Sequence, residues 1–198
     1  MHAQPAFPEH VLVDQAVFRA VMAAMARPGT IVPCRPAGTT APSPLEATTA
    51  MLARALLDYE TPFWLDGALA RTSAVGDWIR FQTGAPLVTD PPQASFAFLA
   101  DPRKAPPFEN FALGTDAYPD RSITLVLQVE RFGQGRGLNL RGPGIAGDAR
   151  MSVEPLPIDI VERLVANRAR FPRGVDLILV APGAVAALPR STRITAGD

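Results

Sequence analysis

The chain has 198 residues, 47% of them hydrophobic and 19% charged, which provides enough apolar material for one sizeable core. Its basic and acidic residues balance to a formal net charge of zero, so no overall field attracts it to nucleic acid or to anionic lipid. The longest apolar run, Val175 to Ala181, is interrupted by Asp176 and is too short to span a membrane.

Four helices are expected from apolar periodicity and from end signals. The first begins at Asp14, which can cap it, and stops at Pro28-Gly29. The second follows Ser43-Pro44-Leu45-Glu46, a capping box with proline at the first helical position. The third starts at Ser73, and the last runs from about residue 157 to 168.

Short apolar segments predict strands between these helices. They cover residues 61–65, 86–88, 94–100, 122–129, 138–140, 175–180 and 185–188. Alternate glycines in 133–137 indicate a hairpin rather than a phosphate-binding loop, and 101–120 is expected to be a loop with one helical turn. The interleaving predicts an α/β fold, with a mixed sheet covered by helices. We expect a flexible N-terminal tail at 1–13 and a single domain at 14–198.

The reactive side chains are few, and their positions exclude much chemistry. Both histidines, His2 and His10, lie near the N-terminus, and the sole lysine, Lys104, lies in a proline-rich stretch. We therefore expect no metal site, no Ser/His/Asp triad and no Schiff-base lysine, hence no bound cofactor. The single cysteine, Cys34, excludes an internal disulfide and fits a reducing compartment, so we expect a cytoplasmic protein.

Arginines stand at the ends of several predicted elements. Arg141 follows a strand and leads into Gly142-Pro143-Gly144, while Arg80, Arg173 and Arg190 flank other helices and strands. The planar guanidinium suits phosphate or phosphonate oxygens, and glycine amides can approach an anion closely. These residues could form an anion pocket or a polar protein interface. Asp176, inside a predicted strand, is a candidate partner for one of the arginines.

Six segments in this order resemble the PhnH family, a subunit family of the bacterial carbon–phosphorus lyase system. They are 18–29, 56–65, Arg80-Phe81-Gln82-Thr83-Gly84-Ala85-Pro86, Leu140-Arg141-Gly142-Pro143-Gly144-Ile145, Phe171-Pro172-Arg173-Gly174-Val175-Asp176 and Pro189-Arg190-Ser191-Thr192. Each motif alone is weak, but together they extend from about residue 14 to residue 195. The resemblance therefore covers nearly the whole chain.

The resemblance implies a cytoplasmic subunit for organophosphonate catabolism. With sister subunits, family members make ribose 1-phosphonate 5-triphosphate from ATP and an alkylphosphonate and release adenine. It also implies a homodimer when isolated, and a three-layer α/β/α sandwich. That sandwich is similar to the large domain of fold-type I pyridoxal phosphate transferases, without the cofactor or its lysine.

Two positions depart from the family pattern: Gln82 stands where a histidine is expected, and Ser191 where a threonine is expected. Glutamine cannot take up a proton near neutral pH, which argues against base catalysis by this chain alone. The resulting hypothesis is a non-autonomous transferase subunit with a pocket for ATP or phosphonate. The pocket would comprise Arg80, Thr83, Arg141, Gly142, Gly144, Arg190 and Ser191. The alternatives are a purely structural adaptor of the same complex and, less favoured, a standalone enzyme.

Overall fold

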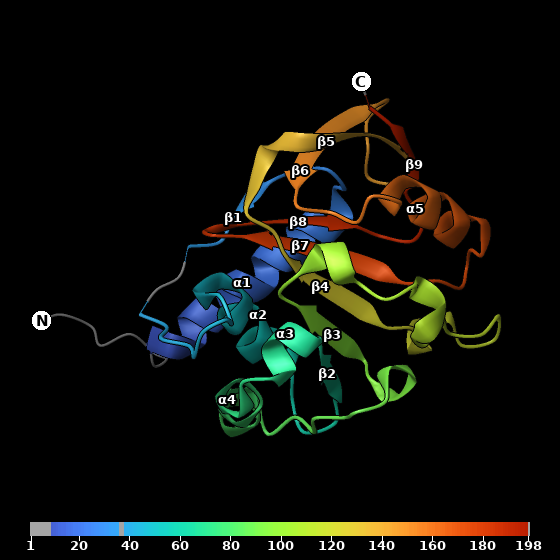
Figure 1. Cartoon of the computed structure of the whole chain (residues 1–198). Helices are drawn as coiled ribbons and strands as arrows, with labels where there is room; N and C mark the ends of the chain where they lie inside the picture. Colours follow the sequence, from blue (N-terminus) through green and yellow to red (C-terminus); the bar gives the residue numbers. More distant parts are fainter. Residues whose placement is uncertain (1–8, 36–37, 198) are drawn as a thin grey trace, which may run out of the picture.

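The computed structural model describes residues 9–35 and 38–197, and within these ranges the main sheet has six strands (Figure 1). Their order is β1-β8-β7-β4-β3-β2. The strands are β1 (Val32–Pro33), β2 (Phe63–Leu65), β3 (Phe96–Leu99), β4 (Thr124–Gln128), β7 (Asp176–Ala181) and β8 (Ala184–Leu188). The four from β2 to β7 are parallel, whereas β8 and β1 run antiparallel to their neighbours. The predicted mixed α/β sheet is confirmed.

Side chains alternate between two hydrophobic cores on the two faces of this sheet. In β4, Val126 faces one core while Leu125 and Leu127 face the other, as the two-residue period of a strand requires. Helices cover the first face (Figure 1). They are α1 (Glu9–Ala26), α2 (Ala47–Leu56), α3 (Gly67–Ala70) and α4 (Ser73–Thr83).

The second face carries a smaller antiparallel sheet together with one helix. Among the described residues this sheet has the strand order β6-β5-β9, and α5 (Ile160–Ala169) lies beside it (Figure 1). Its strands are β5 (Arg131–Arg141), β6 (Ala149–Glu154) and β9 (Arg193–Ala196). The expected α/β/α sandwich therefore needs correction, because this outer layer is mostly sheet: Leu138, Val153 and Ile194 point their apolar side chains into the second core.

Two predicted helix starts are wrong. The first helix begins at Glu9, so Asp14 lies inside it and accepts hydrogen bonds from Arg54 at 2.8 and 3.0 Å. Residues 9–13, expected to belong to the tail, are thus helical, while 1–8 lie outside the described residues. The expected capping box is also absent: α2 starts at Ala47, and the Glu46 amide donates to the Gln128 side chain at 2.9 Å. A distant residue has replaced the local cap.

The glycine-rich segment is not a hairpin between neighbouring strands. Gly133 and Gly135 lie within β5, where the register shifts between Phe132 and Arg136 so that both are paired with Val153. A shift of this kind is a bulge, which glycine accommodates through its positive φ. The strands β4 and β5, on either side of residues 129 and 130, belong to different sheets.

Several connections are short turns of 3-10 helix. They are η1 (Pro91–Gln93), η2 (Pro102–Lys104), η3 (Phe108–Asn110) and η4 (Pro119–Arg121). The loop expected at 101–120 therefore holds more helical turns than the one predicted. The strand expected at 86–88 is reduced to a single bridge between Phe63 and Leu87.

Candidate functional site

The turn after β5 is wedged between two other parts of the chain. Gly142 has φ of 143°, and a Cβ built on it would lie 3.2 Å from the Ser191 carbonyl oxygen. Gly144 has φ of 81°, and a Cβ there would collide with the carbonyl oxygen of Ala26, the last residue of α1. Both glycines are therefore required by close backbone approach as well as by conformation. Through this turn, the second sheet packs against the C-terminal end of α1.

A recess of about 500 Å³ opens beside this turn, and we call it the proline recess. Its lining includes Pro119, Pro143, Phe171, Pro172, Pro189 and Asp120. Gly144, Arg190 and Ser191 from the predicted pocket also line it. The structure thus brings these three together, with Gly142 adjacent through its contact with Ser191.

Arg190 is held firmly inside the proline recess. Its Nε donates to Oδ1 of Asp176 at 3.1 Å, and its Nη2 donates to Oδ2 of the same carboxylate. Nη1 donates to the Pro119 carbonyl at 2.6 Å, and the backbone amide also donates to Asp176 at 2.7 Å. The two side chains are only 15% and 13% exposed. The prediction that Asp176 pairs with one of the arginines is confirmed, and the guanidinium serves to join β7, η4 and the turn after β8.

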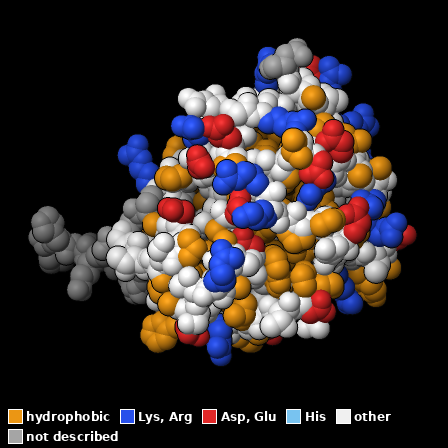
Figure 2. Space-filling view, in the orientation of Figure 1, with side chains coloured by type: hydrophobic (Ala, Val, Ile, Leu, Met, Phe, Trp, Pro, Cys, Tyr) orange, Lys and Arg blue, Asp and Glu red, His pale blue; other side chains and the backbone are white. Residues whose placement is uncertain are grey.

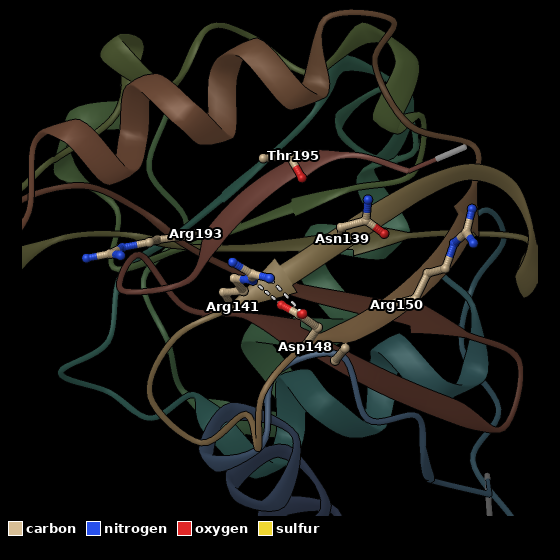
Figure 3. A pocket seen from close by; sticks show the side chains of 7 residues that line it. Asn139, Arg141, Asp148, Arg150, Arg193 and Thr195 are labelled. Atoms are coloured by element: carbon tan, nitrogen blue, oxygen red, sulfur yellow. Dashed lines mark hydrogen bonds and ion pairs between the residues drawn. The ribbon is translucent and has the colours of Figure 1, made fainter.

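Arg141 points to a different place, the outer face of the second sheet. There a second cavity of about 500 Å³, which we call the arginine groove, is lined by Asn139, Arg141, Asp148, Ala149, Arg150, Arg193 and Thr195 (Figure 3). Arg141 donates to both carboxylate oxygens of Asp148, from Nε and from Nη2, the latter at 2.7 Å. This contact lowers the pKa of Asp148 and raises that of Arg141. Arg141 remains 72% exposed, so its outer surface is open to solvent.

Arg80 and Thr83 lie on α4, against the opposite core from the arginine groove. Arg80 is 60% exposed and makes a long ion pair of 3.8 Å with Asp77. Thr83 donates through Oγ1 to Ile79 at 2.8 Å and accepts from the Ala85 amide at 3.0 Å, which completes the helix end. The seven predicted pocket residues are therefore divided among α4, the proline recess and the arginine groove.

Five polar residues of the groove were not predicted from the sequence: Asn139, Asp148, Arg150, Arg193 and Thr195. The sequence pattern that could have located three of them is the alternation of polar and apolar residues. Polar Arg193 and Thr195 flank buried Ile194, and Arg150 precedes buried Met151. Such a period of two marks a strand with one solvated face. Both strands are short, and neither was predicted.

Neither Lys104 nor Cys34 lies in one of these two cavities. Lys104 is 85% exposed and pairs with Asp101 at 3.2 Å. Cys34 is buried, and burial raises the pKa of its thiol. Within residues 9–35 and 38–197, no group of three or more His, Cys, Asp or Glu side chains is placed to hold a metal ion.

The fold defines a mixed α/β protein with an arginine-lined groove on the outer face of its second sheet. Over residues 5–195 the sequence matches the family model described as "Bacterial phosphonate metabolism protein (PhnH)". The chain belongs to the PhnH family, and the resemblance noted from its six segments is confirmed.

Two curated relatives carry related names. One, from Rhizobium meliloti (strain 1021), is "Alpha-D-ribose 1-methylphosphonate 5-triphosphate synthase subunit PhnH". It is 43% identical over 189 residues, which cover 96% of this chain and 94% of the relative. The other, "Putative C-P lyase subunit protein HtxG" from Stutzerimonas stutzeri, is 42% identical over 82 residues, or 41% of this chain and 42% of that protein. In the described part of the chain, no helix combines the length and hydropathy needed to cross a bilayer.

Proposed function

We propose that this chain is a non-autonomous subunit of the machinery that transfers an alkylphosphonate to the ribose of ATP. Adenine leaves, and ribose 1-phosphonate 5-triphosphate is the product, on a route of organophosphonate catabolism. The observation that carries the proposal is 43% identity to a synthase subunit over almost the full length of both chains. Similarity of that extent supports a shared role in a complex with sister subunits.

The side-chain chemistry favours a non-catalytic role for this subunit over independent catalysis. Gln82 replaces the histidine expected from the family pattern and is exposed on α4. Lys104 is exposed and ion-paired, and the Cys34 thiol is buried with a raised pKa, so neither is poised as a nucleophile. Base or covalent catalysis would then come from sister subunits.

The proposal also includes a ligand role for the predicted arginines and glycines. Arg141 supports it most directly, because its guanidinium is exposed and lies in a cavity with two further arginines. Arg190 supports it least, because Asp176 and Pro119 already occupy its donors. Binding of the anion therefore centres on the arginine groove.

A structural adaptor is the second candidate, and an exposed aromatic side chain on α4 favours it. The Phe81 side chain is 87% exposed, which is high for a large aromatic residue. Phe81 also lies within the segment 80–86 that carries the family resemblance. Exposed aromatic side chains of this kind commonly anchor protein interfaces.

Three finer expectations belong to this proposal. The complex would be cytoplasmic, and the isolated chain, folded as one domain from 14 to 198, would form a homodimer. The likeness to the large domain of fold-type I pyridoxal phosphate transferases is supported by the parallel centre of the main sheet. Cell fractionation and light scattering after size-exclusion chromatography test the location and the dimer.

Co-purification tests the proposed function. The tagged chain is expressed in its own host during growth on a phosphonate, and the proteins retained with it are identified. Recovery of sister carbon–phosphorus lyase subunits in fixed stoichiometry is the expected result. Recovery of the chain alone, together with turnover of a small molecule by the isolated chain, would instead identify a standalone enzyme.

A further inference from the structure

The outer edge of β2 is only partly paired. β2 is the last strand of the main sheet, and the segment 86–88 lies along its free side. The Phe63 amide donates to the Pro86 carbonyl at 3.0 Å, and the Val88 amide donates to the Phe63 carbonyl at 2.9 Å. These bonds follow the pattern of a parallel pair, but the pairing ends at the isolated bridge between Phe63 and Leu87. A sheet edge that is paired so briefly leaves backbone groups available to another chain.

Leu65 presents the next backbone amide along this edge. Residues two apart in a strand face the same way, so the Leu65 amide points away from β3, as the Phe63 amide does. The amide of Asp66, one residue further on, instead donates to Phe98 of β3 at 3.0 Å. A continued pair would join the Leu65 amide to the Val88 carbonyl. In the part of the chain that the structure describes, this bond is not made and the Leu65 amide has no acceptor. Leu65 is buried, and a buried amide without an acceptor is rare in folded proteins.

Leu65 and Val88 both line a cavity of about 330 Å³, which we call the β2-edge cavity. Its apolar lining includes Trp64, Leu87 and Val88, and its polar side chains are the hydroxyls of Thr72, Ser73 and Thr89. Among the described residues that line it, none carries a charge. Basic and acidic side chains are interspersed over the face of the molecule seen in Figure 2, so an uncharged lining is a local property. The lining therefore favours an uncharged and mostly apolar occupant.

The backbone groups in the cavity select the polar part of this occupant. Leu65 offers an N–H and Val88 offers a carbonyl, and the two belong to segments that face each other. A group lying between them must accept from the first and donate to the second. A trans amide does both in opposite directions, as each peptide group of a sheet does. An ester can accept but cannot donate, and a carboxylate would bring a charge into an uncharged cavity.

We propose that the β2-edge cavity receives one peptide group of a partner protein, together with an uncharged apolar side chain. The carbonyl of that peptide accepts from the Leu65 amide, and its N–H donates to the Val88 carbonyl. The partner thus continues the backbone pairing that the segment 86–88 begins, which is a known mode of peptide recognition at sheet edges. The cavity is also lined by Ser73 and Gly76 of α4, the helix that exposes Phe81. That the partner is a sister subunit rests on the proposed function, whereas the preference for an amide comes from the cavity itself.

Nuclear magnetic resonance titration of the isotope-labelled full chain tests the recognition of an amide. The probes are N-methylbenzamide and methyl benzoate, which have the same shape but differ in the N–H. N-methylbenzamide should move the Leu65 amide proton downfield, because that N–H gains an acceptor. It should bind about fivefold more tightly than the ester, which leaves the Val88 carbonyl without a donor. Equal affinity of the two probes, or an unchanged Leu65 resonance, would overturn the proposal.

Thr89→Trp tests the partner by filling the cavity from its rim. Residue 89 is exposed, so the variant should keep the urea midpoint of the wild type. It should lose the Leu65 response to N-methylbenzamide and recover at least about fivefold less of one sister subunit. Gln93→Trp is the matched control, because residue 93 is exposed on η1 and does not line the cavity, and it should retain both properties.

The possible failures of this proposal and of the proposed function are distinguishable. Full recovery of every sister subunit by a Thr89→Trp variant that no longer responds to the probe would overturn the protein occupant, and the cavity would then bind a small amide. Absence of sister subunits from the wild-type preparation would contradict the proposed function. The probe titration of the isolated chain does not depend on that result.

Discussion

Arg190 shows how an arginine at the end of a strand can be committed to the fold. Its side chain and its amide both bond to Asp176, which is mostly buried at the start of β7. A carboxylate in such a place requires a partner, since an unpaired buried charge is costly. The pair also reaches the Pro119 carbonyl, so one guanidinium ties three segments together. We therefore assign it to stability rather than to ligand binding.

Arg190→Ala is expected to lower the free energy of unfolding by about 3 kcal/mol, because it leaves the Asp176 carboxylate unpaired. The double variant Arg190→Met with Asp176→Leu should be less destabilised, since it removes both charges. Urea unfolding measures both. Arg141→Ala is the control, and its exposed ion pair should contribute nothing measurable. An Arg190→Ala variant as stable as the wild type would show that the ion pair is dispensable.

Cys34 should react slowly with thiol reagents in the native state. It is 5% exposed, and burial raises the pKa of its thiol, so the reactive thiolate is scarce at neutral pH. Because the pKa is raised, the reaction rate should rise only at a higher pH than for an exposed cysteine. Spectrophotometric titration with a disulfide reagent measures the rate, with the urea-unfolded chain as the fast reference. A native rate equal to the unfolded rate would contradict the buried position.

At the scale of elements, the sequence predicted what local patterns encode. Continuous apolar runs located the inner strands, including β4 and β7, because these strands are buried on both faces. The sequence-based prediction was wrong where contacts between distant residues determine the local structure. The backbone amide of Glu46 donates to the side chain of Gln128, which is 82 positions away, in place of the expected capping box. The seven candidate pocket residues were separated for the same reason. No local pattern indicates that α4 and β5 pack on opposite faces of the main sheet.

The turn after β5 is expected to be intolerant of a side chain at Gly144. Gly144→Ala should destabilise the protein by about 1–3 kcal/mol more than Gly147→Ala. Both residues have positive φ, of 81° and 76°, so the backbone strain is matched. A Cβ at Gly147 meets open space, whereas one at Gly144 collides with the Ala26 carbonyl. Equal urea midpoints for the two variants would show that α1 can move away from this turn.

At the scale of the whole molecule, the main sheet separates two surfaces with different character. The layer on one face is helical, whereas the other face carries the second sheet (Figure 1). Phe81 on α4 is exposed on the helical layer, and the arginine groove lies on the second sheet. A subunit of a complex can use such a division, because it can bind a partner through one layer and an anion through the other. Arg80 and Thr83 then belong to the partner surface rather than to the groove.

Phe81→Ser tests this division. The Phe81 side chain is 87% exposed, so its removal should leave the urea unfolding midpoint unchanged. An aromatic anchor in a protein interface, by contrast, contributes about 2 kcal/mol or more to the binding free energy. We therefore expect reduced recovery of sister subunits by a variant that is as stable as the wild type. Ile158→Ser, equally exposed but preceding α5 on the other face, is the matched control and should retain the partners bound through α4. Full recovery of every partner with Phe81→Ser would show that Phe81 on α4 does not contribute to the interface. The match of segment 80–86 to the family pattern would then have to reflect a role other than partner binding.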